Sequence, residues 1–272
     1  MTKPVYKYLN GQNSFFEKRI LRITPKQWLN DPFEVEPSIK AKAKYVYGKI
    51  NNKNNITIEG LEKMYLFNRK NLATDEYLKD FLNDYGMISF TERDKKKLLM
   101  WSHYANEHKG FAIEFDANHE FFNQQDSNPL LKKLMPVKYD DIRDGDVSDH
   151  AEWFFKKSTE WKDEHEYRIV FKLTDSDWVK NGPRFYSPEI DNFKGYCSAA
   201  QNFCFVTVPE EAINAVYFGV SADSSFIEEE YRFIKANEKL KHVKTYLAKK
   251  SPDHFELTFE EFDLNSLQKL IP

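Results

Sequence analysis

The chain has little cysteine and little glycine, and each shortage excludes a class of protein. Two cysteines among 272 residues, Cys197 and Cys204, are too few for a disulfide framework and lack the spacing of a zinc site. Nine glycines, without a Gly-x-x-x-x-Gly-Lys loop, argue against a phosphate loop or a glycine-rich Rossmann turn. We therefore expect two reduced, buried thiols and no nucleotide site of either glycine-rich type.

Charge of one sign and long apolar runs are also missing. The net charge is −3 and the isoelectric point is about 6.2, so no global basic field favours nucleic-acid binding. The first residues lack the apolar stretch of a signal peptide, and no run of about 18 apolar residues predicts a membrane span. We expect a cytoplasmic protein with no membrane partner.

The chain does contain enough apolar material for a folded core. Hydrophobic residues make up 41% of it and charged residues 31%, which excludes a disordered chain. We find neither an internal repeat nor a low-complexity linker. The sequence therefore predicts a single domain over residues 1–272.

The hydrophobic pattern predicts an α+β fold around a central mixed or antiparallel sheet. Strands are expected at 5–9, 20–23, 87–91, 111–115, 137–139, 164–173, 203–208, 215–220, 243–247 and 255–259. Helices are expected at 98–107, 148–161 and 226–235. Residues 38–85 have helical spacing with cap residues at Ser38, Thr57 and Thr74, and form a helical insertion. Residues 221–272 are expected to complete the sheet.

Two polar motifs lie on expected loops and strands. Asn30 and Asp31 precede a proline, which indicates either a structural turn or a loop at the rim of a pocket. Ser89 and Thr91 are two residues apart on an expected strand, so their hydroxyls share one face. That face is either solvated or directed at a ligand.

A third motif is Leu-Met-Trp-Ser-His-Tyr-Ala at residues 99–105, followed by His108-Lys109-Gly110. Trp101, His103 and Tyr104 lie unusually close together for an exposed helix, and they indicate either a pocket wall or ordinary packing. His103 and His108 are five residues apart, which is a poor spacing for a metal pair on one helical face.

The fourth motif is Glu-His-Glu-Tyr-Arg at residues 164–168, at the start of an expected strand. Alternation places Glu164, Glu166 and Arg168 on one face. Two carboxylates so close repel, and one can acquire a raised pKa. The group is either a surface ion pair or a catalytic carboxylate aimed into a cleft from a rigid strand.

In their order and spacing, these motifs resemble a large, mostly bacterial family of domains of unknown function. The resemblance runs from about residue 5 to about residue 220. It rests on Tyr-Lys-Tyr (6–8), Asn-Asp-Pro-Phe-Glu (30–34), Ser-Phe-Thr-Glu (89–92), the motif of residues 99–110, and Trp161 with Glu-His-Glu-Tyr-Arg. It implies a bacterial, cytoplasmic protein without assigning an activity.

The motif order also resembles that of ADP-ribosyltransferase-like folds. Those folds carry a basic residue or histidine on the first strand, a hydroxyl-aromatic motif on a middle strand and a glutamate at the start of a late strand. Lys7, Ser89-Phe90-Thr91 and Glu166 match these elements. Position 7 is lysine where the known subgroups have arginine or histidine, and the helical insertion separates the first two elements.

This second resemblance implies NAD⁺ as the substrate and no metal cofactor. It makes Glu166 the catalytic carboxylate, holding the ribose 2′-hydroxyl, and Glu164 the group that orients or deprotonates the acceptor. Lys7 would contact the pyrophosphate. The residues expected to bind the nucleotide are Tyr6, Lys7, Asn30, Asp31, Ser89, Thr91, Trp101, His103, Tyr104 and Arg168.

The leading hypothesis is therefore an NAD-using enzyme that transfers ADP-ribose to a protein or nucleic acid, or hydrolyses the dinucleotide. By analogy, its setting is that of a toxin or an antiphage-defence effector. One alternative is a non-catalytic module that senses a small molecule or binds a protein. A third hypothesis is a metal-dependent nuclease that uses Glu164, Glu166 and Asp31.

Overall fold

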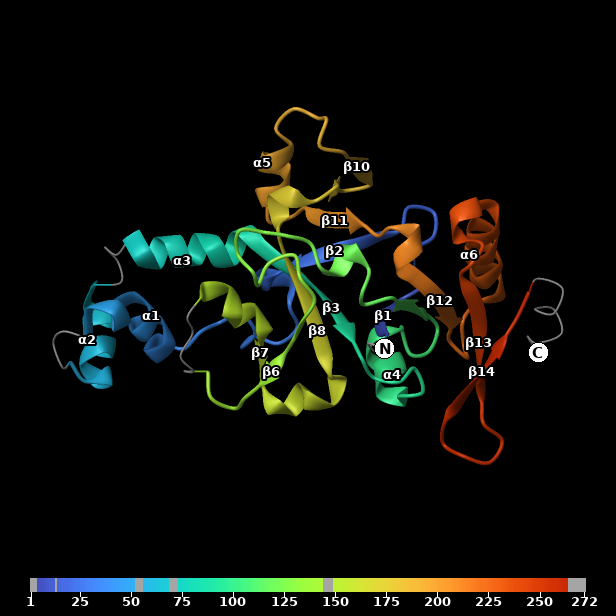
Figure 1. Ribbon diagram of the computed structural model, residues 1–272, viewed down its shortest axis with the longest axis horizontal. Helices are drawn as coiled ribbons and strands as arrows, with labels where there is room; N and C mark the ends of the chain where they lie inside the picture. Colours follow the sequence, from blue (N-terminus) through green and yellow to red (C-terminus); the bar gives the residue numbers. More distant parts are fainter. Residues whose placement is uncertain (1–3, 13, 52–55, 69–72, 144–148, 264–272) are drawn as a thin grey trace.

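The computed structural model describes residues 4–12, 14–51, 56–68, 73–143 and 149–263, and its ribbon is drawn in Figure 1. The α-helices of this part are α1 (Ile39–Asn51), α2 (Ile58–Asn68), α3 (Ala73–Asp84), α4 (Leu98–Tyr104), α5 (Phe193–Ser198) and α6 (Ser224–Ala236). Its strands are β1 (Val5–Leu9), β2 (Ile20–Pro25), β3 (Tyr85–Thr91), β4 (Phe111–Phe115), β5 (Met135–Pro136), β6 (Lys138–Tyr139), β7 (Lys156–Lys157), β8 (Glu166–Lys172), β9 (Trp178–Asn181), β10 (Arg184–Tyr186), β11 (Phe203–Thr207), β12 (Ile213–Phe218), β13 (Lys244–Lys250) and β14 (Leu257–Glu261).

One large sheet contains most of these strands. Its hydrogen-bonded order is β10-β9-β11-β2-β3-β1-β4-β12-β13-β14, with β8 paired to β3 and β5 to β8. Within this sheet, the pairing of β12 with β13 is parallel, and the other pairings between described strands are antiparallel. The prediction of an α+β fold with a largely antiparallel sheet is therefore confirmed.

The expected helical insertion is present between β2 and β3. Helices α1, α2 and α3 lie together at one end of the molecule, away from α6, β13 and β14 (Figure 1). Ser38 and Thr57 accept hydrogen bonds from backbone amides in the first turns of α1 and α2, as their positions predicted. The third helix begins at Ala73, one residue before the expected cap at Thr74.

The main core lies on one face of the sheet, where alternate strand residues are apolar. Leu21 and Ile23 of β2 and Ile88 and Phe90 of β3 are buried in it. Helix α6 covers part of this core and contributes Ile227 and Ile234, among others. The opposite face of β3 therefore carries Met87, Ser89 and Thr91, and this is the face that leads to the candidate site.

The prediction of a helix at 148–161 is wrong for the described part of that range, residues 149–161. The structure has two 3-10 helices, His150–Phe155 and Thr159–Glu164, separated by strand β7. A capping box around Asp149 starts the first of them, and Lys156 is extended and pairs with β6. Three consecutive buried aromatic side chains, at positions 153–155, cannot all face the core from one side of a regular α-helix.

Several other element ends differ from the prediction by one to three residues, and three of them have a local cause. Strand β8 starts at Glu166 because His165 has a left-handed backbone with φ of 46°, so Glu164 ends a 3-10 helix and does not lie on the strand. Helix α4 stops at Tyr104 because residues 106–108 have positive φ. The last strand begins at Leu257, two residues late, because Phe255 is fully exposed in the hairpin turn.

Candidate functional site

Strands β1, β3 and β8, helix α4 and the segments that carry Glu34 and Lys157 enclose a small cavity. Strand β3 lies between β8 on one edge and β1 on the other, with Tyr6 opposite Thr91 and Thr91 opposite Glu166. The cavity has a volume of about 160 Å³. It is lined by Tyr6, Lys7, Tyr8, Leu29, Asn30, Glu34, Ser89, Phe90, Thr91, Met100, Tyr104, Lys157, Glu164 and Glu166. Most of the polar residues predicted from the four motifs therefore meet at one place.

Lys7 lies where the sheet opens beside β3. In the described strands, β1 pairs with this edge of β3 at Thr91 and β2 pairs with it at Met87 and Gly86, so the stretch between is without a strand partner. The Lys7 ammonium donates a hydrogen bond of 2.9 Å to the Ser89 carbonyl in this stretch. Burial lowers the pKa of Lys7 to about 8; Glu166 opposes this shift and Arg22 adds to it.

Glu166 is held by two cations. Arg168 donates to both of its carboxylate oxygens, at 2.6 and 2.8 Å, and the Lys157 ammonium lies 3.0 Å from Oε2. Burial alone favours the protonated acid, but these partners outweigh it and lower the pKa of Glu166 to about 2. Glu166 therefore carries a full negative charge at neutral pH, although its side chain is only 5% exposed.

The Arg168 guanidinium is completely buried behind Glu166. It donates to Glu34 at 2.6 Å and to the Phe154 carbonyl at 2.7 Å in addition to its two bonds with Glu166. Burial acts to lower the pKa of Arg168, but the charges of Glu166 and Glu34 outweigh burial, so the pKa is raised. Arg168 thus positions Glu166 from behind and does not face the cavity, because it is absent from the lining.

Lys157 connects the three carboxylates of the site. Its ammonium lies 3.1 Å from Glu34, 2.6 Å from Glu164 and 3.0 Å from Glu166. Burial acts to lower the pKa of Lys157, but these carboxylates, led by Glu166, raise it. The sequence reasoning missed Lys157, because it assigned the residue to a helix and gave it no partner.

Glu164 is the more accessible of the two motif carboxylates, with 13% of its side chain exposed. Its Oε1 accepts a hydrogen bond from the Tyr104 hydroxyl, and its Oε2 faces Lys157. Thr91 donates to the Glu164 backbone carbonyl. Burial raises the pKa of Tyr104, and the bond to Glu164 raises it further, so this hydroxyl stays protonated. Thr91 and Tyr104 thereby fix the direction of the Glu164 side chain.

Four predicted binding residues lie outside the cavity lining or have another role. The Trp101 ring is fully buried against Tyr8, and its indole nitrogen donates to the Lys95 carbonyl. His103 is exposed on α4. Asp31 accepts a hydrogen bond of 2.8 Å from the backbone amide of Phe33, which is the structural turn considered for its motif. Arg168 supports Glu166 from behind, as described above.

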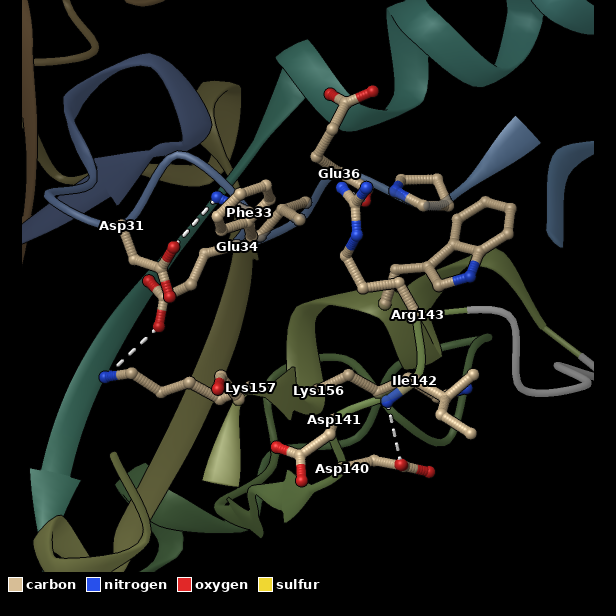
Figure 2. A pocket seen from close by; sticks show the side chains of 14 residues that line it. Asp31, Phe33, Glu34, Glu36, Asp140, Asp141, Ile142, Arg143, Lys156 and Lys157 are labelled. Carbon is tan, nitrogen blue, oxygen red and sulfur yellow. Dashed lines mark hydrogen bonds and ion pairs between the residues drawn. The ribbon is translucent and has the colours of Figure 1, made fainter. Parts of the chain in front are cut away.

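A second pocket, of about 270 Å³, adjoins the cavity and is shown in Figure 2. Glu34 and Lys157 line both hollows, so their ion pair lies between them. On the far side of the second pocket, the Arg143 guanidinium stacks 4.8 Å from the centre of the exposed Phe33 ring. The Glu34–Lys157 ion pair in Figure 2 thus forms a wall that the two hollows share, with a charged face toward each of them.

No group of three or more histidine, cysteine, aspartate or glutamate side chains in the described residues is arranged to hold a metal ion. The nuclease hypothesis required Asp31 beside Glu164 and Glu166, but Asp31 lines the second pocket only. Among the described helices, none combines the length and the apolar character needed to cross a membrane.

A family model described as a protein of unknown function (DUF2971) matches residues 100–169. The matched segment includes Tyr104, Lys157, Glu164 and Glu166 of the cavity and Arg168 behind them. It supports the resemblance to a family of domains of unknown function, and it assigns no activity. No curated protein and no solved structure matches the chain.

Proposed function

We propose that the protein is an NAD-using, ADP-ribosyltransferase-like enzyme that transfers ADP-ribose or hydrolyses the dinucleotide. One observation carries the proposal. The three elements of the motif order, Lys7 on β1, Ser89 on β3 and Glu166 at the start of β8, come from strands that adjoin in the sheet and line one cavity.

The cavity is of a size to receive one end of a dinucleotide. Its volume of about 160 Å³ is below the roughly 300–1,000 Å³ of pockets that enclose a whole drug-sized ligand. The nicotinamide and its ribose form the compact, reactive end, and the aromatic rings of Tyr8 and Tyr104 provide walls for it. In this arrangement the diphosphate and adenosine of the bound dinucleotide extend out of the cavity through its mouth.

The reaction breaks the bond between nicotinamide and ribose C1′. Nicotinamide departs with the bonding electron pair, and positive charge develops on the ribose. Glu166 remains ionised because its pKa is held near 2, so a fixed negative charge stabilises that transition state. Lys157 and Arg168 offset part of this charge but fix its position to hydrogen-bond precision.

The acceptor then bonds to C1′ and releases a proton. Glu164 is placed to take it, since it is the more exposed carboxylate and is oriented by Tyr104 and Lys157. The second pocket adjoins the cavity at Lys157, and we propose it as the side from which a macromolecular acceptor or water approaches. By analogy alone, we retain a toxin or antiphage-defence setting.

One observation favours the alternative, a binding module without turnover. Glu34, Glu164 and Glu166 each already have a cation within 3.1 Å, so the cavity could recognise a polar ligand without activating it. Such a module would bind NAD⁺ or a related molecule with saturation and release no nicotinamide.

The test is incubation of the purified protein with NAD⁺, followed by chromatographic measurement of nicotinamide. We expect release by the wild type, loss of release in Glu164→Gln and in Glu166→Gln, and unchanged release in Glu189→Gln. Glu189 is an exposed glutamate outside both hollows and serves as the matched control. An NAD⁺-dependent rise in melting temperature without release supports the binding module. The absence of both the rise and the release overturns both proposals.

A further inference from the structure

The two cysteines of the chain meet in the fold. Cys197 is in the last turn of α5 and Cys204 is on β11, and both are free thiols. The Cys204 thiol donates a hydrogen bond of 3.5 Å to the Cys197 carbonyl, and the Ser176 hydroxyl lies 3.3 Å from the Cys197 sulfur. The two thiols therefore belong to one hydrogen-bonded group and not to separate parts of the core.

Both cysteines line a further hollow of about 320 Å³, the thiol cavity, together with Asn83, Leu173 and Asn202 among others. Each cysteine is only 2% exposed, so this cavity is the route by which a small molecule reaches the sulfurs. One water molecule needs roughly 10–15 Å³ of such space, so the thiol cavity has room for an oxidant as small as hydrogen peroxide. It shares no lining residue with the candidate site or the second pocket.

The two thiols are chemically unequal. A hydrogen bond from the Cys204 thiol lowers the pKa of Cys197, and the Ser176 hydroxyl lowers it further, although burial acts in the other direction. The same hydrogen bond, together with burial, raises the pKa of Cys204. The thiolate is the nucleophilic form of cysteine, so Cys197 is the attacking sulfur and Cys204 remains a protonated thiol beside it.

We propose that Cys197 and Cys204 are a redox-active pair that hydrogen peroxide converts into an intramolecular disulfide. The Cys197 thiolate attacks one peroxide oxygen, the O–O bond breaks and hydroxide leaves, which produces a sulfenic acid on Cys197. The Cys204 thiol then attacks the sulfenic sulfur, so the S–S bond forms, the S–O bond breaks and the hydroxyl leaves as water with the Cys204 proton. In total the two thiols lose two electrons and two protons, and the peroxide is reduced to two water molecules. The inference is independent of the proposed function.

The test treats the reduced, folded chain with hydrogen peroxide and measures the mass of the peptide that contains both cysteines. The wild-type peptide is expected to lose two hydrogen atoms and to regain them with dithiothreitol. Cys204→Ser should stop at a sulfenic acid on Cys197, which dimedone traps. Ser176→Ala removes a hydrogen bond to the Cys197 sulfur and should slow the oxidation about threefold to tenfold, because the thiolate fraction falls. Ser102→Ala, at an exposed position on α4, should leave the rate unchanged.

Two results would overturn the redox pair. The first is that the folded chain keeps both thiols under conditions that oxidise the same chain in urea, because the thiol cavity then does not admit the oxidant. The second is that Cys197 is oxidised to a sulfinic or sulfonic acid without a disulfide, because the two sulfurs then do not meet. Both results come from the wild type, so the test stands even where a serine variant fails to fold.

Discussion

Glu166 beside the cavity and Glu230 on α6 are both buried glutamates, but their surroundings differ. Arg168 and Lys157 hold Glu166 in its charged form and lower its pKa to about 2. Glu230 is fully buried; its Oε2 accepts from the Phe16 amide, its Oε1 has no partner, and burial raises its pKa. The difference teaches that burial alone raises the pKa of a carboxyl group, and that the cations beside the cavity reverse this shift for Glu166.

The largest effect in this comparison is expected from Arg168→Met. The change leaves Glu34 and Glu166 buried without their main cation, and removing one partner of a buried ion pair costs about 3–5 kcal/mol. The free energy of unfolding in urea measures the loss. Arg232→Met removes an exposed pair on α6 and should cost less than about 1 kcal/mol. Similar losses in both variants would contradict the account of the buried network.

A smaller effect is expected when the two glutamates are replaced in turn. Glu166→Gln keeps the shape but loses charged hydrogen bonds to Arg168, which are worth about 1.5–3 kcal/mol. Glu230→Gln replaces a carboxyl whose neutral form the fold already favours, so the free energy of unfolding should change by less than about 1 kcal/mol. Equal destabilisation by the two replacements would show that the cavity carboxylate is not specially held.

The pH dependence of stability should differ in sign between the two residues. The folded-state pKa of Glu166 is depressed, so its contribution is present above pH 4.5 and is lost as the pH falls toward about 2. Glu230 has a raised pKa, so its contribution is present below pH 4.5 and is lost as the pH rises through its folded-state value. Urea unfolding of wild type, Glu166→Gln and Glu230→Gln across pH 2–8 separates the two slopes. A variant with an unchanged slope would refute the assignment for its residue.

A further effect on stability is expected from Lys7→Met, and it should appear only at alkaline pH. Burial lowers the pKa of Lys7 to about 8, so the folded protein loses this proton before the unfolded chain does. Wild-type stability should therefore gain a contribution as the pH rises from about 8 to 10.5, and the gain should vanish in Lys7→Met. Thermal melts over that range, beside Lys244→Met at an exposed position, provide the measurement. The same gain in both variants would disprove the shift.

Much of the sheet could be predicted from the sequence because alternation is a local property. The pattern of β3 places Ser89 and Thr91 on one face and Phe90 on the other, and the structure has that arrangement. Glu166 was likewise predicted to begin a rigid element. The start of β8 was misplaced because a histidine, His165, adopts a left-handed conformation that favours glycine, and sequence spacing does not reveal it.

The ion network could not be predicted, because its members are far apart in the chain. Glu34, in the segment after β2, meets Lys157 on β7 and Arg168 on β8 only through the tertiary structure. The motif around Trp101 left both a pocket wall and ordinary packing open, and the ring packs fully into the interior beside small neighbours such as Ala105.

The central claim is that the cavity cleaves NAD⁺ with its motif carboxylates. The most direct measurement is nicotinamide release by wild type, Glu164→Gln and Glu230→Gln under identical conditions. Glu164 does not contact Arg168 directly, and glutamine keeps an oxygen that can accept from Tyr104, so Glu164→Gln should remove activity while lowering the melting temperature less than Glu166→Gln does. The account predicts release by the wild type and Glu230→Gln and none by Glu164→Gln. Equal release by all three, or no release together with no NAD⁺-dependent rise in melting temperature, would contradict it.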